Sequence, residues 1–357
     1  MNNVVRARLL EKEELLSPYA AKERLSKGRI LLEESPGLRT EFQRDRDRII
    51  HSNAFRRLKH KTQVFISPAG DHYVTRLTHT LEVSQIARTI TRALNLNEDL
   101  VEAMTLGHDM GHTPFGHLGE EELDRLYPFG YSHADQGVRI VEKLEKKGRG
   151  LNLTQEVKDG IASHSKPKDN LMGVNIDEEP LESQICRISD AVAYLNHDIG
   201  DAIRAGIISE EDIPGDCQLL LGQSHSQRVN SIVNDIVAES WQATGLAGED
   251  HISQIKIAMS TPVLEACNTL RSFMFAKVYS EAGKGDLPVC AREVLGLLYE
   301  EFSLHPERIS GEYFIKGDSP ERIAVDYISG MTDQFALHLA EQIKPGITSH
   351  ISQRFLM

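Results

Sequence analysis

The chain has 357 residues, of which 40% are hydrophobic and 26% charged, and its formal net charge is −13. This length is enough for a large buried core, and the acidic balance argues against nonspecific nucleic-acid binding over the whole surface. No apolar run reaches the roughly 20 residues of a membrane span, the N-terminus lacks the apolar core of a signal peptide, and the four cysteines form no CxxC pair, so we expect a cytoplasmic protein without a membrane partner.

Apolar residues recur at three- and four-residue spacing along most of the chain, which predicts amphipathic helices. The expected helices cover residues 77–94, 98–109, 181–203, 252–279, 291–302 and 320–343. One small β-hairpin is expected over residues 63–74, where β-branched and aromatic residues flank a Pro-Ala-Gly-Asp turn. The expected loops cover residues 111–116, 147–152, 165–179 and 213–222. The predicted fold is therefore all-α, one helical unit over residues 1–357 with a catalytic core over 40–205 and a helical extension over 206–357 packed on that core.

A helix that ends in a His-Asp doublet carries the main chemical signal. The helix predicted to end at Asp109 brings His108 and Asp109 to its terminus, where both side chains can turn toward one ion. Imidazole and carboxylate together suit Mn, Fe, Co, Ni or Zn, and carboxylates also hold Mg. A lone doublet is weak evidence, so further ligands are needed, and His79 and Asp190 each lie on another predicted helix. We therefore expect one divalent metal ion, Mn or Mg first, held by these four residues.

The residues that follow the doublet predict an acid/base pair. Gly111, Pro114 and Gly116 are typical of a tight turn that starts a new helix near His117. Glu120 then lies three residues later on the same helical face. A carboxylate that orients an imidazole makes the ring a good proton carrier near neutral pH. The same pair would also serve as a simple hydrogen bond at a helix start, and His112 could contact phosphate or a bound water.

The order His, His-Asp, Asp on separate helices resembles the HD superfamily of metal-dependent phosphohydrolases. The block HDMGHTPFGHLGE, preceded by NAFRRLKHKTQV and followed by SHADQG, RISDAVAYLNHD and DYISGMTD, looks like the deoxynucleoside triphosphate triphosphohydrolases, which include the bacterial dGTPases. The resemblance covers most of the chain, from about residue 39 to about residue 336. It implies an HD-domain helical core, a divalent metal and hydrolysis of a dNTP to deoxynucleoside and intact triphosphate.

The resemblance also implies substrate contacts at named positions. Arg76 should bind phosphate one turn from His79. Gln63 and Asp198 should bind the sugar 3′-hydroxyl, and Tyr194 should pack against the deoxyribose. The spacing of Asp190, Tyr194 and Asp198 is i, i+4 and i+8, which places all three on one helical face. The remaining implied contacts are to the phosphates or to the base and sugar side, from His133, Lys166, Tyr327 and Asp333.

Other functions and partners stay open at this point. A different HD-type enzyme, such as a nucleotide phosphodiesterase or 5′-nucleotidase, would share the four metal ligands, and a nucleotide-sensing protein with little turnover would share the fold. The basic cluster from Arg56 to Lys61 is usually a solvated helix face. In the family this region lies near a regulatory nucleotide site between subunits, so it could bind a second dNTP or a single-stranded nucleic acid. The resemblance implies a homo-oligomer under allosteric control.

Overall fold

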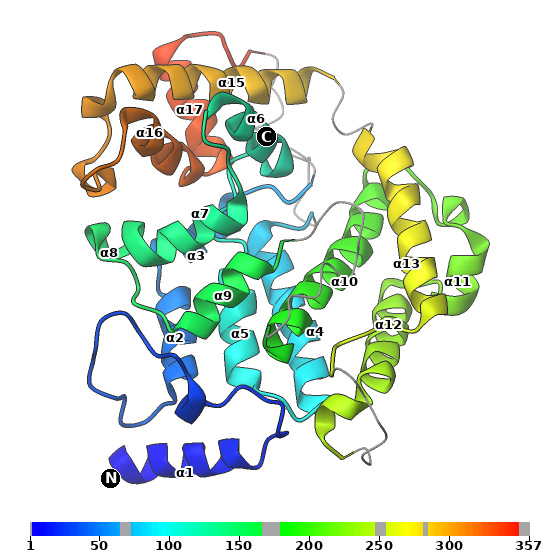
Figure 1. The fold of residues 1–357 in the computed structure, drawn as a ribbon. Coiled ribbons are helices and arrows are strands. Elements are labelled where there is room, and N and C mark those ends of the chain that lie inside the picture. The colour runs from blue at the N-terminus through cyan, green and yellow to red at the C-terminus, as the bar shows by residue number, and fades with distance from the viewer. Residues whose placement is uncertain (1, 65–72, 166–178, 247–254, 281–284, 350–357) are drawn as a thin grey trace. The chain divides into compact units, whose positions relative to one another are not determined.

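The computed structural model describes residues 2–64, 73–165, 179–246, 255–280 and 285–349, and helices joined by loops account for most of them (Figure 1). No β-sheet is present within these ranges, which confirms the all-α fold class. The expected hairpin is not seen. Most of it, residues 65–72, lies outside the described residues, and its described flanks meet only in one isolated antiparallel bridge between Thr62 and Thr75.

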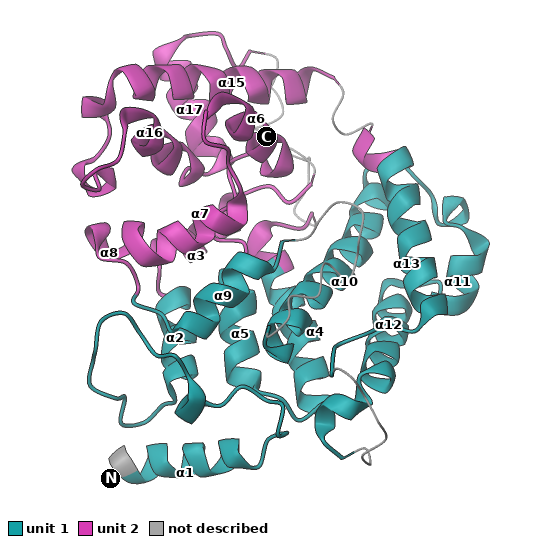
Figure 2. Ribbon diagram, in the orientation of Figure 1, with its two compact units in different colours: residues 1–50, 80–108, 152–276 teal, residues 51–79, 109–151, 277–357 magenta. Residues whose placement is uncertain are grey.

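The chain forms two compact units, each assembled from stretches that are separated in the sequence (Figure 2). Unit 1 contains residues 1–50, 80–108 and 152–276, and unit 2 contains residues 51–79, 109–151 and 277–357. The expected division into a core over residues 40–205 and an extension over 206–357 stays a prediction. Within the described ranges, no helix is both long enough and apolar enough to cross a bilayer.

Unit 1 is built around α5 (Glu98–Gly107), which packs against three other helices of the unit. The side chain of Asn97 accepts a hydrogen bond from the backbone of Leu100, and acidic residues in the first turn complement the positive end of the helix dipole. A Cβ at Gly107 would lie 2.8 Å from the side chain of Ile161, so glycine permits close helix packing here. The other α-helices of unit 1 are α1 (Asn2–Glu14), α2 (Glu41–Ile50), most of α4 (Arg76–Ala93), α9 (Gln155–Ser163), α10 (Leu181–Arg204), α11 (Gly215–Leu221), α12 (His225–Glu239) and α13 (Thr261–Met274).

Unit 2 is built around α15 (Asp286–Leu304), which packs against α6 (Gly116–Leu126), α16 (Pro320–Ser329) and α17 (Asp333–Ile343). Buried apolar side chains from all four helices form one core cluster, which also includes Phe115. The short helices α3 (Asn53–Arg57), α7 (His133–Arg139) and α8 (Glu145–Gly148) belong to the same unit, and so do the first residues of α4, Arg76 to His79.

Three predicted elements differ in the structure. The helix expected over residues 320–343 is two helices, because the chain breaks at Gly330 and Thr332 starts α17 as its N-cap. The loop expected over residues 213–222 contains the two-turn helix α11, whose start at Gly215 follows a proline. The helix expected over residues 252–279 begins only at Thr261, and a π-helical turn (Phe275–Tyr279) follows it; residues 252–254 lie outside the described part.

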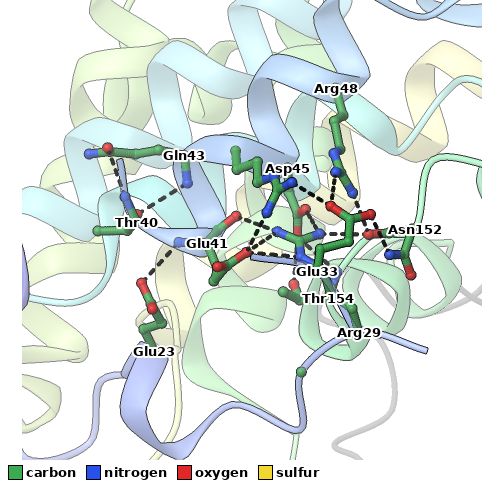
Figure 3. A network of polar contacts seen from close by, with 12 residues as sticks. Glu23, Arg29, Glu33, Thr40, Glu41, Gln43, Asp45, Arg48, Asn152 and Thr154 are labelled. Carbon is green, nitrogen blue, oxygen red and sulfur yellow. Dashed lines mark hydrogen bonds and ion pairs between the residues drawn. The ribbon is translucent and has the colours of Figure 1, made fainter. Parts of the chain in front are cut away.

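A buried ion-pair network ties the N-terminal segment of unit 1 to α2 and α9 (Figure 3). Arg29 forms ion pairs with Glu41 and with the fully buried Asp45, and it donates a hydrogen bond to the backbone oxygen of Asn152 at 2.6 Å. Asp45 also accepts hydrogen bonds from the backbone and hydroxyl of Thr154, at 2.8 and 2.7 Å, at the start of α9. The network therefore fixes α9 beside α2 in unit 1.

Removing Asp45 should be costly because the buried Arg29 would lose one carboxylate partner, keeping Glu41, and the backbone N–H and hydroxyl of Thr154 would lose their acceptor. We expect Asp45→Ala to lower the free energy of unfolding by about 3 to 5 kcal/mol. Asp47 on the same helix pairs with Arg39 near the surface, so Asp47→Ala should cost less than about 1 kcal/mol. Urea unfolding of both variants measures the difference, and equal losses would contradict a stabilising role for the buried pair.

Candidate functional site

The carboxylate of Asp109 is the centre of a buried polar cluster in unit 2. Arg76 donates a hydrogen bond to Asp109 Oδ2 at 2.8 Å, and His79 Nε2 lies 3.8 Å from the same oxygen. His112 Nε2 lies 3.3 Å from Asp109 Oδ1. All four side chains are at most 4% exposed. Three predicted site residues, Arg76, His79 and His112, therefore lie around the Asp109 carboxylate, and the Arg76 guanidinium balances its charge.

Glu120 lies beside three imidazoles of this unit, those of His112, His117 and His133. Its Oε1 accepts hydrogen bonds from the backbone N–H and the Nδ1–H of His133, at 2.8 and 2.7 Å. Its Oε2 lies 3.3 Å from His117 Nδ1 and 3.9 Å from His112 Nδ1. The rings of His112 and His133 are stacked, with centroids 3.9 Å apart. The structure thus joins His117 and Glu120, as their spacing predicts, and adds His133 as a second partner that helical spacing could not indicate.

The protonation of these groups follows from burial and charge. Burial opposes ionisation of Glu120, but the hydrogen bonds from His117 and His133 outweigh it and hold the carboxyl pKa well below its ordinary value. Burial alone would lower the pKa of His133, but the Glu120 carboxylate raises it above its ordinary value. Burial and the nearby Arg76 keep the pKa of His112 well below its usual range. A neutral ring therefore stacks on a ring that favours its charged form.

The turn between α5 and α6 brings these groups together. A Cβ at Gly111 would lie 2.0 Å from the backbone oxygen of His133, so this position requires glycine. Phe115 has a φ of 62°, which is strained for a residue other than glycine, and Gly116 follows with a φ of 61°. The helix α6 then begins at Gly116, one residue before His117, so the predicted turn and helix start are both present.

Unit 1 carries the other two predicted metal ligands, His108 and Asp190, and two of the predicted sugar contacts, Tyr194 and Asp198. His108 is the C-terminal cap of α5, and its Nδ1 lies 2.6 Å from the backbone oxygen of Thr105. Because a carbonyl only accepts, Nδ1 is the donor in this contact, and the tautomer with its proton on Nδ1 has a lone pair on Nε2. That Nε2 lies 4.0 Å from Asp190 Oδ1. His164, which our sequence analysis did not select, packs edge-on against His108 with ring centroids 5.0 Å apart and bonds its own helix end in the same way.

The residues predicted to contact the sugar, base or phosphates differ in their burial and in their partners. Asp198 is fully buried and lies 2.8 Å from His197 Nδ1, and the Tyr194 ring packs edge-on against His197. Gln63 is 4% exposed, and its Oε1 has no hydrogen-bond partner among the described residues. Tyr327 packs against two aromatic rings in the core of unit 2. Lys166 lies outside the described residues.

The basic cluster from Arg56 to Lys61 is only partly a solvated face. Arg56, Lys59 and His60 are exposed, as expected. Lys61 is 2% exposed, and its ammonium donates hydrogen bonds to the backbone oxygens of His112 and Ser329. The expectation of a solvated face is therefore wrong for Lys61, whose side-chain nitrogen donates hydrogen bonds to backbone oxygens inside unit 2.

Two family models match the chain: an HD domain over residues 76–195 and a phosphohydrolase-associated domain over residues 257–342. A deoxyguanosinetriphosphate triphosphohydrolase-like protein of Caldanaerobacter subterraneus subsp. tengcongensis is 50% identical over 330 residues, which cover 90% of each chain. The chain belongs to this deoxyguanosinetriphosphate triphosphohydrolase-like family. Members of the family from Desulfatibacillum aliphaticivorans and Clostridium tetani are 44% and 43% identical, and they cover 92% and 91% of this chain. The alignments span 95% and 92% of those two relatives.

Membership in the family makes this chain an HD-type hydrolase. HD domains bind divalent metals, and the His and Asp groups described above can hold one. Each unit offers donors whose chemistry suits such an ion: His108 Nε2 and the Asp190 carboxylate in unit 1, and the His79 imidazole and the Asp109 carboxylate in unit 2. Among solved structures, a hypothetical protein from Aquifex aeolicus aligns at a TM-score of 0.47 and 20% identity, covering 87% of this chain and 71% of that one.

Proposed function

We propose that this chain hydrolyses deoxynucleoside triphosphates to deoxynucleoside and inorganic triphosphate, with the help of one divalent metal ion. The observation that carries the proposal is the contact of Glu120 with His117, in the same unit as the Arg76–Asp109 ion pair. An acid/base pair and a buried cation for phosphate are the two parts that hydrolysis of a phosphoester needs. The printed names of the relatives support the choice of substrate.

We propose His79, His108, Asp109 and Asp190 as the metal ligands, with Mn or Mg as the first choice and Fe, Co, Ni or Zn as other candidates. Two ligands of one ion, each about 2.1 Å from it, can be separated by up to about 4.2 Å. The His79–Asp109 distance of 3.8 Å in unit 2 and the His108–Asp190 distance of 4.0 Å in unit 1 fit that limit. When bound, the ion would polarise a phosphate oxygen.

The chain's own groups would then direct water to the α-phosphorus, with the 5′-oxygen as the leaving atom. Glu120 would hold the Nδ1–H of His117, so that His117 Nε2 takes a proton from water or gives one to the leaving oxygen. Arg76 and His133 would balance negative charge on the phosphates, and the neutral His112 would contact a phosphate oxygen or a bound water. We assign Gln63 and Asp198 to the 3′-hydroxyl and Tyr194 to the deoxyribose, and leave Lys166 and Tyr327 as candidates for further contacts. Gln63 Oε1 is buried and has no hydrogen-bond partner within the described ranges, which supports its assignment.

Product analysis tests the proposal directly. Purified protein would be incubated with each of the four dNTPs, singly and mixed, with Mn or Mg, and the products separated by anion exchange. Deoxynucleoside and inorganic triphosphate are the expected products. Pyrophosphate or orthophosphate would favour another HD-type phosphohydrolase, and dNTP binding without turnover would favour a nucleotide-sensing protein.

We also propose that the chain forms a homo-oligomer in the cytoplasm and that a regulatory dNTP binds near the basic cluster. Arg56, Lys59 and His60 are exposed and would supply its charge contacts, whereas the buried Lys61 would not. Activity that appears only in dNTP mixtures, and is lost in Lys59→Ala, would support this site.

A further inference from the structure

Asp333, the first residue of α17, is a buried carboxylate that binds two distant segments of unit 2. Its Oδ2 accepts a hydrogen bond from the backbone N–H of Thr62 at 2.9 Å and another from the Thr62 hydroxyl. Its Oδ1 accepts a hydrogen bond from the backbone N–H of Phe115 at 3.0 Å. The side chain is 4% exposed. Asp333 therefore faces the chain's own donors rather than solvent, in contrast to the substrate contact that the resemblance implies.

The bond to Phe115 holds the start of the helix that carries the acid/base pair. Phe115 is the N-cap residue of α6 and has left-handed backbone angles. Its side chain makes no capping hydrogen bond to the helix. A strained conformation of this kind persists only when its surroundings fix it. Here the Phe115 side chain is locked in the apolar core and its N–H is held by Asp333. His117 and Glu120 follow within the first turns of the same helix.

The bond to Thr62 reaches the phosphate-binding side of the same unit. Thr62 pairs with Thr75, and the backbone oxygen of Lys61 accepts a hydrogen bond from the backbone N–H of Arg76 at 3.2 Å. The side-chain nitrogen of Lys61 also donates a hydrogen bond to the backbone oxygen of His112, so this short segment contacts the turn before α6 directly. Asp333 thus contacts both the segment before Gln63 and the residue before α6.

We propose that Asp333 is a positioning residue that holds His117 and Glu120 at a fixed position relative to Arg76. It does not touch the reacting atoms; it sets where the acid/base pair stands relative to the phosphate-binding guanidinium. The inference rests on the proposed function, because it assumes that these residues act on one substrate.

The test compares three variants. Asp333→Asn keeps the size of the side chain but turns an NH₂ group toward donors, which removes at least one hydrogen bond. Thr62→Val removes only the hydroxyl and serves if Asp333→Asn folds poorly. The matched control is Asp326→Asn, which alters another buried aspartate of unit 2, one bound to Arg139 and Arg322 and not to the turn. Each variant is assayed with a dNTP at a temperature well below the Tm of that variant.

We expect Asp333→Asn to lower kcat about 100-fold while KM changes less than about threefold, since a small misplacement of reacting groups costs about this much. Thr62→Val should lower kcat less, and Asp326→Asn should leave it nearly unchanged even where Tm falls. Equal losses of kcat in Asp333→Asn and Asp326→Asn, or no loss in either, would overturn the inference.

Hydrogen exchange separates failure of this inference from failure of the proposed function. If the unaltered chain hydrolyses no dNTP, the proposed function falls, and amide exchange over residues 113–120 decides the role of Asp333. Faster exchange there in Asp333→Asn than in Asp326→Asn would support the positioning role, and equal exchange would overturn it.

Discussion

Replacing Asp109 with asparagine is expected to lower kcat/KM for dNTP hydrolysis by about 1000-fold or more, because the proposed metal ligand and the partner of Arg76 are lost together. The Asp109 carboxylate contacts Arg76, His79 and His112 within one buried cluster. An asparagine there would remove the Asp109 charge from the buried Arg76 guanidinium. We also expect the metal content of the purified protein to fall, which mass spectrometry of the bound metal measures independently of turnover.

The matched control for Asp109 is Asp99→Asn on α5, the helix that ends just before His108 and Asp109. Asp99 lies in the first turn of α5 and accepts a hydrogen bond from Gln43 at 2.8 Å. It contacts none of the residues around Asp109 in the described structure, so metal content and kcat/KM should stay close to those of the unaltered chain. Asp109→Asn protein with a full complement of metal and normal turnover would remove Asp109 from the proposed ligand set.

The second large effect is expected at Glu120. Glu120→Gln should lower kcat by about 10²- to 10⁴-fold, the usual contribution of general acid–base catalysis, while the metal content stays unchanged. Glutamine can still accept one hydrogen bond through its oxygen, but its NH₂ group must then face one of the two imidazoles that Glu120 now binds. The charge that raises the pKa of His133 is lost as well.

Glu121→Gln is the control for Glu120, since Glu121 is the next residue on α6 and lies on the surface near Arg292. Exposed pairs of this kind contribute little, so its kcat should hardly change. Comparing His117→Gln with His133→Gln then identifies the proton carrier. A larger loss in His133→Gln would move the acid/base role from the exposed His117 to the buried His133.

Local patterns predicted much of the fold, and tertiary contacts explain the exceptions. The helix α5 was predictable because its apolar positions, its Asn97 cap and its acidic first turn all agree. The break between α16 and α17 was not predictable from the sequence. Both helices bury an apolar face in the same cluster, so the helical spacing of apolar residues continues across Gly330. The Pro214-Gly215 pair lies within the loop expected over residues 213–222, but it starts α11 instead.

The candidate site shows the same division. The pairing of His117 with Glu120 follows from helical spacing, whereas the pairing of Glu120 with His133 joins two helices and leaves no periodic signal. Lys61 lies within a run of basic residues that pattern alone assigns to solvent, yet it is buried because two backbone oxygens receive its ammonium. Short-range patterns do not record such long-range partners.

The hydrogen bond between Thr62 and Asp333 spans 271 residues of sequence, which has a consequence for the growing chain. At about 5 to 20 residues per second on the ribosome, Thr62 waits about 14 to 54 seconds before Asp333 is even synthesised. Loop closure over such a distance is also a slow step in folding. The contacts of Asp333 with Thr62 and Phe115 therefore form only after the start of α17 has been synthesised, and a chain truncated before residue 333 cannot form them.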